Sequence, residues 1–303
     1  MDFHRLDRHV PHRWYLRAHL VFRPPSSALK NLAQLEFILV KEKTFSRLTQ
    51  AACEAALIAG ELLRQGFGSQ FKVSSKEGRH NLVTEYDTKA EQAILAHLKK
   101  AASTSSFLAE ESGATGQLGD LLWVVDPLDG TVNFAHNIPF FSVSIALEEK
   151  GDIVSGVVYH PHSNELFVAE KGEGAFLNGK KMQVSSVSRL EQSILATGFP
   201  YNLADNPFHC IEHFIDIVKL GIPIRKLGSA ALDLAYTAAG RFEGFFAVGL
   251  SPWDCAAGVL LIQEAGGQVS HWNEKYFSIH SRLPILATNG RIHKQTASIL
   301  HKL

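Results

Sequence analysis

A fourteen-residue stretch, LLWVVDPLDGTVNF, constrains this chain more than any other part of its sequence. An apolar run over 121–125 ends abruptly on Asp126, and Asp129, Gly130 and Thr131 follow at once. This pattern predicts a buried strand that delivers two carboxylates at its C-terminal end. Hard divalent cations prefer carboxylate and carbonyl oxygens, whereas a phosphate group prefers the backbone N–H groups of a tight turn. The stretch can therefore supply ligands for both.

Composition narrows the classes of protein to consider. The 303 residues suffice for one large domain or two ordinary ones, and the hydrophobic fraction of 46% is that of a globular protein. A formal net charge of zero argues against broad binding to nucleic acid or to a membrane surface. Cys53, Cys210 and Cys255 are far apart and odd in number, which predicts buried thiols in a reducing compartment. No apolar run approaches the roughly 20 residues that cross a bilayer, and we expect a cytoplasmic protein.

The first 43 residues differ from the rest of the chain. Five arginines and four histidines precede position 24, and Asp2 and Asp7 argue against a transit peptide, which is poor in acids. We expect residues 1–43 to form a flexible or partly helical extension, unless translation has been assigned from too early a start. Nothing spaces these histidines as metal ligands.

Periodicity divides the remaining chain into two parts. Helices are predicted over 44–68, 89–100, 208–220, 229–239, 255–265 and 291–302. Short strands are predicted over 107–109, 195–197, 245–248 and 285–287. An antiparallel sheet is expected over about 140–187, with a type I′ hairpin at Asn178-Gly179. The prediction is thus an α+β metal-binding part over 44–190 and an α/β part over 191–303 that completes the active site.

Four further acids lie at predicted strand-to-helix junctions. Glu110 and Glu111 follow a short strand, and Asp87 and Asp254 each open a helix. Taken singly, each is explained as a helix cap or a solvated loop residue. Gathered at one edge of a sheet with the two aspartates of the opening stretch, they would repel one another unless two or three divalent cations were bound. A two-metal phosphoester hydrolase requires such a set; unrelated surface acids are the alternative.

Six motifs in this order carry a resemblance to a known family. They are LVTEYD at 82–87, EES at 110–112, DPLDGTVNF at 126–134, GEGAFLNG at 172–179, GSAALDL at 228–234 and PWDCAAG at 252–258. Over about 46–300 the chain resembles the inositol monophosphatase family of Mg²⁺-dependent, lithium-sensitive phosphatases. The resemblance implies an α/β (α+β) fold, the layered α-β-α-β-α sandwich of the inositol monophosphatase and fructose-bisphosphatase type, and a homodimer.

The resemblance also implies a set of metal ligands. Glu110, Asp126 and the carbonyl of Leu128 would hold one Mg²⁺, and Asp126, Asp129 and Asp254 would hold a second. A third, weaker ion would depend on Glu110 and waters. No covalent phosphoenzyme is expected.

The resemblance also implies which residues surround the attacking water and which contact the substrate. Asp87, Glu111 and Thr131 would surround the attacking water, which Thr131 positions and whose proton it accepts or relays. The residues implied to contact the substrate are Gly130, Thr131, Ser229 and Ala230. The partner would be a small phosphate ester.

One position departs from the family pattern. Relatives that hydrolyse inositol phosphates often carry a Glu seven residues before the aspartate of the Trp-Asp motif, where it binds ring hydroxyls; here that position is Ala247. We expect inositol 1-phosphate or a related polyol or sugar phosphate as substrate. Fructose 1,6-bisphosphate and histidinol phosphate are alternatives, as is a 3′(2′),5′-bisphosphate nucleotide, against which Asn133-Phe134 argues. A binding scaffold that keeps the fold is the non-enzymatic alternative.

Overall fold

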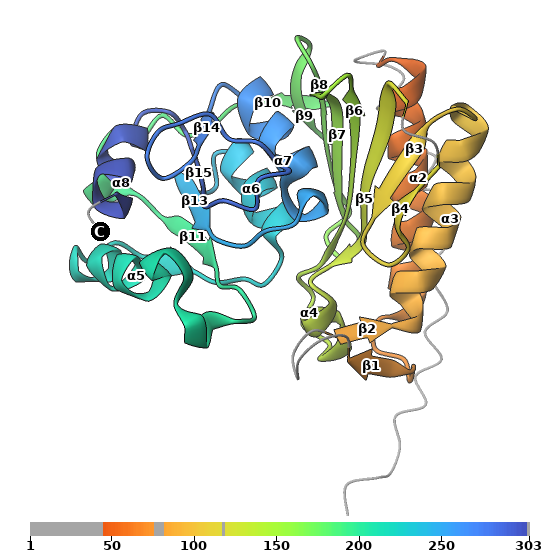
Figure 1. Cartoon of the computed structure of the whole chain (residues 1–303), viewed down its shortest axis with the longest axis horizontal. Helices are drawn as coiled ribbons and strands as arrows, with labels where there is room; N and C mark the ends of the chain where they lie inside the picture. Colours follow the sequence, from red (N-terminus) through yellow and green to blue (C-terminus); the bar gives the residue numbers. More distant parts are fainter. Residues whose placement is uncertain (1–44, 76–81, 117–118, 302–303) are drawn as a thin grey trace, which may run out of the picture.

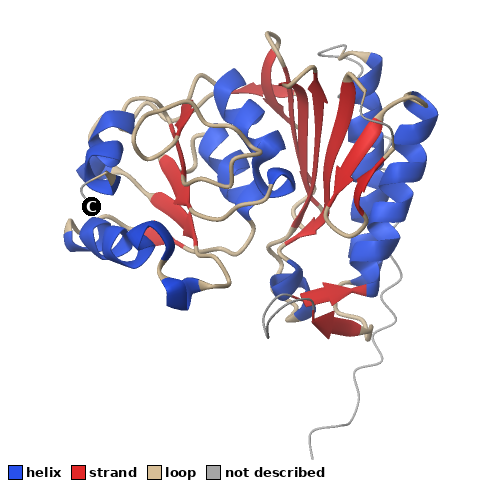
Figure 2. Cartoon of the chain, viewed as in Figure 1, coloured by secondary structure: helices blue, strands red, loops and turns tan. Residues whose placement is uncertain are grey.

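The computed structural model describes residues 45–75, 82–116 and 119–301. The extension predicted over 1–43 lies outside these residues. The chain stacks five layers, helices alternating with sheets (Figures 1 and 2). The layered sandwich expected from the sequence is confirmed. None of the helices in the described ranges is long and apolar enough to span a membrane.

The outer helical layer is a pair, α2 (Arg47–Gly66) and α3 (Glu85–Ala101). The apolar side of α2 is buried, and its N-cap, Ser46, accepts a hydrogen bond from the backbone N–H of Thr49. Helix α3 begins four residues before the predicted start because Thr84 and Asp87 form a capping box. A short hairpin, β1 (Val73–Ser75) with β2 (Leu82–Thr84), precedes α3.

The large sheet has the strand order β10-β9-β8-β7-β6-β5-β3-β4. Its strands are β3 (Ser106–Ala109), β4 (Gly113–Thr115), β5 (Leu121–Asp129), β6 (Ser142–Glu149), β7 (Asp152–His160), β8 (Glu165–Glu170), β9 (Gly174–Leu177) and β10 (Lys180–Met182). All neighbours are antiparallel except β3 and β5. Asn178 and Gly179 both have positive φ, 49° and 77°, which confirms the expected hairpin turn.

The smaller sheet has the order β12-β11-β13-β15-β14. Its strands are β11 (Leu195–Gly198), β12 (Ile224–Arg225), β13 (Gly244–Ala247), β14 (Gln268–Ser270) and β15 (Ile285–Thr288). Strand β11 runs parallel to β12 and β13, and the other pairs are antiparallel. The remaining helical elements are α4 (Thr131–Ala135), η1 (Leu190–Gln192), η2 (Leu203–Asp205), η3 (Pro207–His209), α5 (Cys210–Lys219), α6 (Ala230–Ala238), α7 (Pro252–Glu264) and α8 (His293–Leu300).

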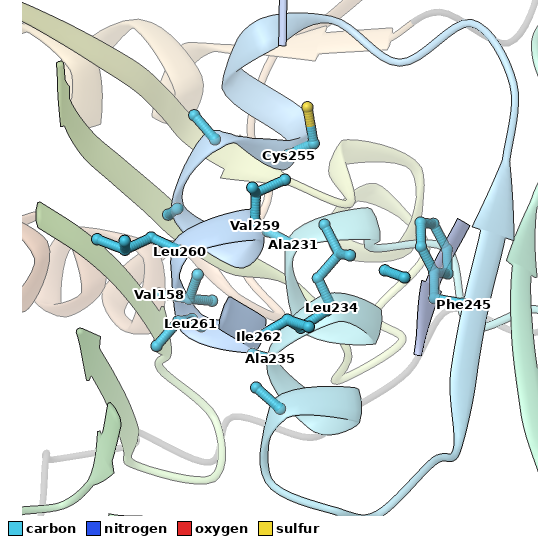
Figure 3. Packing of buried hydrophobic residues seen from close by; sticks show 14 of the residues in the cluster. Val158, Ala231, Leu234, Ala235, Phe245, Cys255, Val259, Leu260, Leu261 and Ile262 are labelled. Carbon is cyan, nitrogen blue, oxygen red and sulfur yellow. The ribbon is translucent and has the colours of Figure 1, made fainter. Parts of the chain in front are cut away.

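Helices α6 and α7 form the central layer between the two sheets (Figure 1). Buried residues of both helices pack with buried residues of the two sheets in one hydrophobic core, part of which Figure 3 shows. Two glycines permit the close approach: a Cβ on Gly258 would lie 2.4 Å from Cβ of Leu234, and one on Gly156 would lie 2.8 Å from the carbonyl oxygen of Ala257. The three cysteines are buried free thiols, as expected.

Candidate active site

Strand β5 carries the first two acids of the site. It continues to Asp129 rather than ending at Asp126 as the sequence suggested, because Asp126 pairs with Ser144 and Asp129 with Ser142. Three residue steps on β5 therefore match two on β6, which is a bulge with one extra residue. In a regular strand, side chains three residues apart point to opposite faces, and the extra residue breaks that alternation.

Register brings Glu110 and Asp254 to Asp126. Ala109 pairs with Val125 in the parallel β3–β5 pair, so the next residues, Glu110 and Asp126, emerge side by side. Ser144, opposite Asp126, donates its hydroxyl to the carbonyl of Trp253 at 3.1 Å and so fixes the start of α7. Asp254 lies one residue further on, as the third residue of α7 within a capping box rather than as the N-cap.

The gathered aspartates raise one another's pKa. Burial raises the pKa of Asp126 well above its ordinary value, and the charges of Glu110, Asp129 and Asp254 raise it further. The pKa of Asp254 rises for the same reasons, burial first and the Asp129 charge second. Burial also raises the pKa of Asp129 to about 6, against hydrogen bonds that lower it.

Asp126, Asp129 and Asp254 lie near one another, but their side chains are not arranged around one point as metal ligands are. Among the residues that the structure describes, no three His, Cys, Asp or Glu side chains are grouped as a metal ion would require. One oxygen of Asp126 and one of Asp254 accept local hydrogen bonds: Asp126 Oδ1 accepts from the N–H of Leu128 at 3.0 Å, and Asp254 Oδ2 accepts from that of Ser251 at 2.7 Å. The donor set itself, carboxylates at the end of a strand, fits Mg²⁺ chemically.

Asp87 and Thr131, both predicted site residues, lie within hydrogen-bonding distance of each other. Thr131 Oγ1 lies 3.0 Å from Asp87 Oδ1 and 3.0 Å from the carbonyl oxygen of Leu128. Asp87 Oδ2 accepts from both the N–H and the hydroxyl of Thr84, at 2.8 and 2.6 Å. Burial nevertheless raises the pKa of Asp87 to about 6. Asp87 can therefore exchange a proton near neutral pH, next to a hydroxyl.

Gly130 forms the turn between β5 and α4. Its φ is +94°, and an added Cβ would lie 3.0 Å from the carbonyl oxygen of Phe140 and 3.2 Å from that of Gly228. Only glycine fits a backbone so confined at positive φ. The turn is thus pressed against two segments that are distant in sequence.

Ser229 and the start of α6 hold Asp129. The Ser229 hydroxyl donates to Asp129 Oδ2 at 2.5 Å, and the N–H of Ala231 donates to the same oxygen at 2.8 Å. Ser142 Oγ lies 3.2 Å from Ser229 Oγ. Ala230, which the resemblance also implied as a substrate contact, is the first residue of α6.

Two buried acids of the site escaped the sequence analysis. Glu91, one turn after Asp87 on α3, accepts from the N–H of Glu111 at 2.8 Å and so supports the Glu110–Glu111 turn. Asp233 lies one turn after Ser229, and burial, then the Asp129 charge, raises its pKa. Within the described ranges its Oδ1 has no hydrogen-bond partner. The i, i+4 spacing from the predicted site residues Asp87 and Ser229 was the available signal for both.

Solved structures place this fold and site in a class. A SuhB protein from Bartonella henselae is 41% identical, with a TM-score of 0.80 over 85% of this chain and 99% of its own. An inositol monophosphatase from Anabaena is 37% identical, with a TM-score of 0.74 over 84% of this chain and 95% of its own. With the acidic site, this architecture defines a phosphoric monoester hydrolase.

Sequence comparisons give the family. The model of the inositol monophosphatase family matches residues 45–303, and the chain belongs to this family. Inositol-1-monophosphatase of Mesorhizobium japonicum is 45% identical over 74% of this chain and 85% of the relative. Inositol-1-monophosphatase of Caulobacter vibrioides is 43% identical over 80% and 96%. A relative from Pseudomonas aeruginosa, 46% identical over 72% and 83%, is named Nus factor SuhB.

Proposed function

We propose that this protein is a Mg²⁺-dependent phosphatase that hydrolyses a small alcohol phosphate by direct attack of water on phosphorus. The observation that carries the proposal is the group formed by the buried Asp126 and the partly buried Asp129 and Asp254, each of which has its pKa raised by desolvation and by neighbouring acids. Such a group is unfavourable by itself, and cations that bind carboxylates relieve the repulsion.

The ligand set follows the family pattern. Glu110, Asp126 and the carbonyl of Leu128 would hold one Mg²⁺, Asp126, Asp129 and Asp254 a second, and Glu110 with waters a weaker third. Bound Mg²⁺ would lower the pKa of water and stabilise charge on the leaving oxygen. Asp126 is the shared ligand, which agrees with its position beside both Glu110 and Asp254.

The proposed proton path uses Thr131 and Asp87. Thr131 would orient the attacking water and pass its proton toward Asp87, whose pKa of about 6 suits a group that takes up protons near neutral pH. Glu111 would lie beside the same water. The N–H groups of Gly130 and Thr131, and the start of α6 at Ser229 and Ala230, would face the phosphate ester.

Inositol 1-phosphate or a related polyol or sugar phosphate is the proposed substrate, because the relatives from Mesorhizobium and Caulobacter bear the name inositol-1-monophosphatase. Ala247 qualifies this proposal. Its methyl group, 2% exposed at the end of β13, offers no acceptor to a ring hydroxyl. Gly198 pairs with Ala247 at the end of the neighbouring strand β11, and it has no side chain that could replace the missing acceptor.

Phosphate release from a substrate panel tests the proposal. The panel holds inositol 1-phosphate, fructose 1,6-bisphosphate, histidinol phosphate, adenosine 3′,5′-bisphosphate and glycerol 2-phosphate, each with and without Mg²⁺ and lithium. We expect one dominant substrate, absolute dependence on Mg²⁺ and inhibition by lithium. Ala247→Glu should favour inositol 1-phosphate selectively, and Ala247→Leu is the size control. Turnover that is equal without Mg²⁺ would overturn the metal assignment.

Assembly and location remain proposals as well. We propose a homodimer in the cytoplasm, in which the parts 44–190 and 191–303 together form each active site. Light scattering in solution would give the mass directly, and a monomer at micromolar concentration would contradict the dimer.

A further inference from the structure

The segment 139–142 packs against the turn at Gly130, which follows Asp129. Gly130 packs against the backbone of Phe140 and Phe141, where an added Cβ would lie 3.0 to 3.3 Å away. Asn133 Nδ2 donates to the carbonyl of Phe140 at 2.7 Å. Any shift of the segment would therefore move the turn that carries Asp129.

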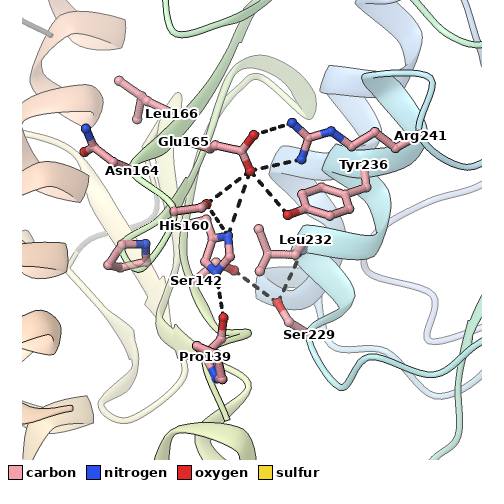
Figure 4. Close-up of polar contacts among 12 residues, drawn as sticks. Pro139, Ser142, His160, Asn164, Glu165, Leu166, Ser229, Leu232, Tyr236 and Arg241 are labelled. Carbon is pink, nitrogen blue, oxygen red and sulfur yellow. Dashed lines mark hydrogen bonds and ion pairs between the residues drawn. The ribbon is translucent and has the colours of Figure 1, made fainter. Parts of the chain in front are cut away.

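The same segment begins a directed hydrogen-bond relay to Asp129. The carboxylate of Asp129 only accepts, so the single hydroxyl hydrogen of Ser229 is used on it, at 2.5 Å. The contact of 3.2 Å between the two serine hydroxyls must then be donated by Ser142. The order is Ser142 to Ser229 to Asp129, and Figure 4 shows the two serines facing each other.

His160 holds the other end of this segment. Its Nε2 lies 3.1 Å from the carbonyl oxygen of Pro139, and because a carbonyl only accepts, that nitrogen carries the proton. The His160 ring is 4% exposed. The ring of Phe140 contacts those of both His160 and Tyr236, with centroids 5.6 and 5.7 Å apart. The segment is thus fixed by a buried imidazole and by α6.

Glu165 in turn anchors His160 to the far end of α6. Ser163 Oγ lies 2.5 Å from His160 Nδ1 and 3.1 Å from Glu165 Oε2. Arg241 forms a two-pronged ion pair with Glu165, and the Tyr236 hydroxyl donates to Oε2 at 3.3 Å (Figure 4). Burial alone would raise the pKa of Glu165, but the nearby His160 ring and the hydrogen bonds from Arg241 hold that pKa well below its usual value.

We propose that His160 and Glu165 are positioning residues for phosphoester hydrolysis, acting through Pro139 and the 139–142 segment on the placement of Asp129. Neither residue contacts the acidic group, and neither is among the ligands or proton carriers assigned above. The expected effect on the rate rests on the proposed function, because it presupposes phosphatase activity. Supporting partners of metal ligands affect metal affinity or activity by about 10- to 100-fold when removed.

A pair of His160 variants tests this proposal. His160→Phe keeps an aromatic ring against Phe140 but cannot donate to Pro139, whereas His160→Gln places an amide N–H near the former Nε2. We expect His160→Phe to lower kcat and Mg²⁺ affinity by about tenfold with KM little changed, and His160→Gln to recover most of the loss. Glu165→Gln keeps an acceptor but loses the charge, and its kcat and Mg²⁺ affinity should lie between those of His160→Phe and His160→Gln. His97→Phe, at a partly exposed histidine on α3 that pairs with Glu54, is the control.

The readouts separate this proposal from the proposed function. Mg²⁺ affinity from calorimetry reports on Asp129 whether or not a substrate is turned over. Absence of turnover by the wild type across the panel would overturn the proposed function alone. A His160→Phe variant with wild-type kcat and Mg²⁺ affinity would overturn the positioning role. Equal losses in His160→Phe and His160→Gln, in step with a lower melting temperature, would also overturn it, because they indicate a structural role only.

Discussion

Lowering the pH from 7 to 5 is expected to weaken Mg²⁺ binding by at least about tenfold. Metal binding requires ionised carboxylates, and burial raises the pKa of Asp129 to about 6 in the metal-free protein. The apparent association constant falls by the factor 1 + 10^(pKa − pH), which is about 11 at pH 5 and about 1.1 at pH 7. The difference is about 1.4 kcal/mol for one group. Because the pKa values of Asp126 and Asp254 are also raised, the measured slope should be steeper.

Isothermal titration calorimetry in two buffers of different ionisation enthalpy measures both the affinity and the protons released. We expect proton release on binding at pH 5 that largely disappears at pH 8. Asp129→Asn is the control, since it removes one titrating group and should flatten the pH dependence. An affinity that changes less than twofold between pH 7 and 5, with no proton release, would refute the reasoning.

Three further predictions concern other residues. Asp126→Asn should lower kcat more than Asp87→Asn, because Asp126 is shared between two ions in the proposed ligand set; comparable kcat values would refute the shared role. Gly156→Ala should lower the free energy of unfolding by about 1–3 kcal/mol, since its Cβ would lie 2.8 Å from the carbonyl oxygen of Ala257, and an unchanged denaturant midpoint would contradict this. His293→Gln should reduce the loss of stability on acidification: burial lowers the pKa of His293 from 6.5 to about 4, so the unfolded chain takes up the proton first and stability falls as pH falls through that range. Urea titrations at pH 7 and pH 5 measure the difference, and equal losses in both proteins would exclude His293 as a cause.

Local patterns predicted the elements of this fold well. The alanine- and leucine-rich stretch 44–68 indicated a helix, and α2 occupies Arg47–Gly66. Alternation after residue 140 indicated the antiparallel strands, and Asn178-Gly179 fixed one hairpin. The errors lie at element ends and in short elements, since β1, β2, β4, α4 and β12 were not predicted. Helix α3 starts early because a capping box forms, and β5 runs past Asp126 because a bulge absorbs one residue.

Long-range contacts of the site could not be read from spacing. The contact between Ser142 and Ser229 joins residues 87 apart in the chain, and His160 reaches the site through Pro139. Periodicity locates a serine on a strand but does not say which helix packs over it. The resemblance to a family named candidate ligands, whereas the residues that support them from distant parts of the chain, such as Ser142, needed three-dimensional structure.

The most direct test of the central claim is a Mg²⁺ titration of phosphate release by the wild type and by Asp126→Asn, on the best substrate of the panel. We predict that the wild type has no activity without the ion and gains it as Mg²⁺ rises, whereas Asp126→Asn remains at least about 100-fold slower at every concentration, as expected when a shared ligand is lost. Wild-type turnover independent of Mg²⁺, or an Asp126→Asn variant with the wild-type titration curve, would contradict the account.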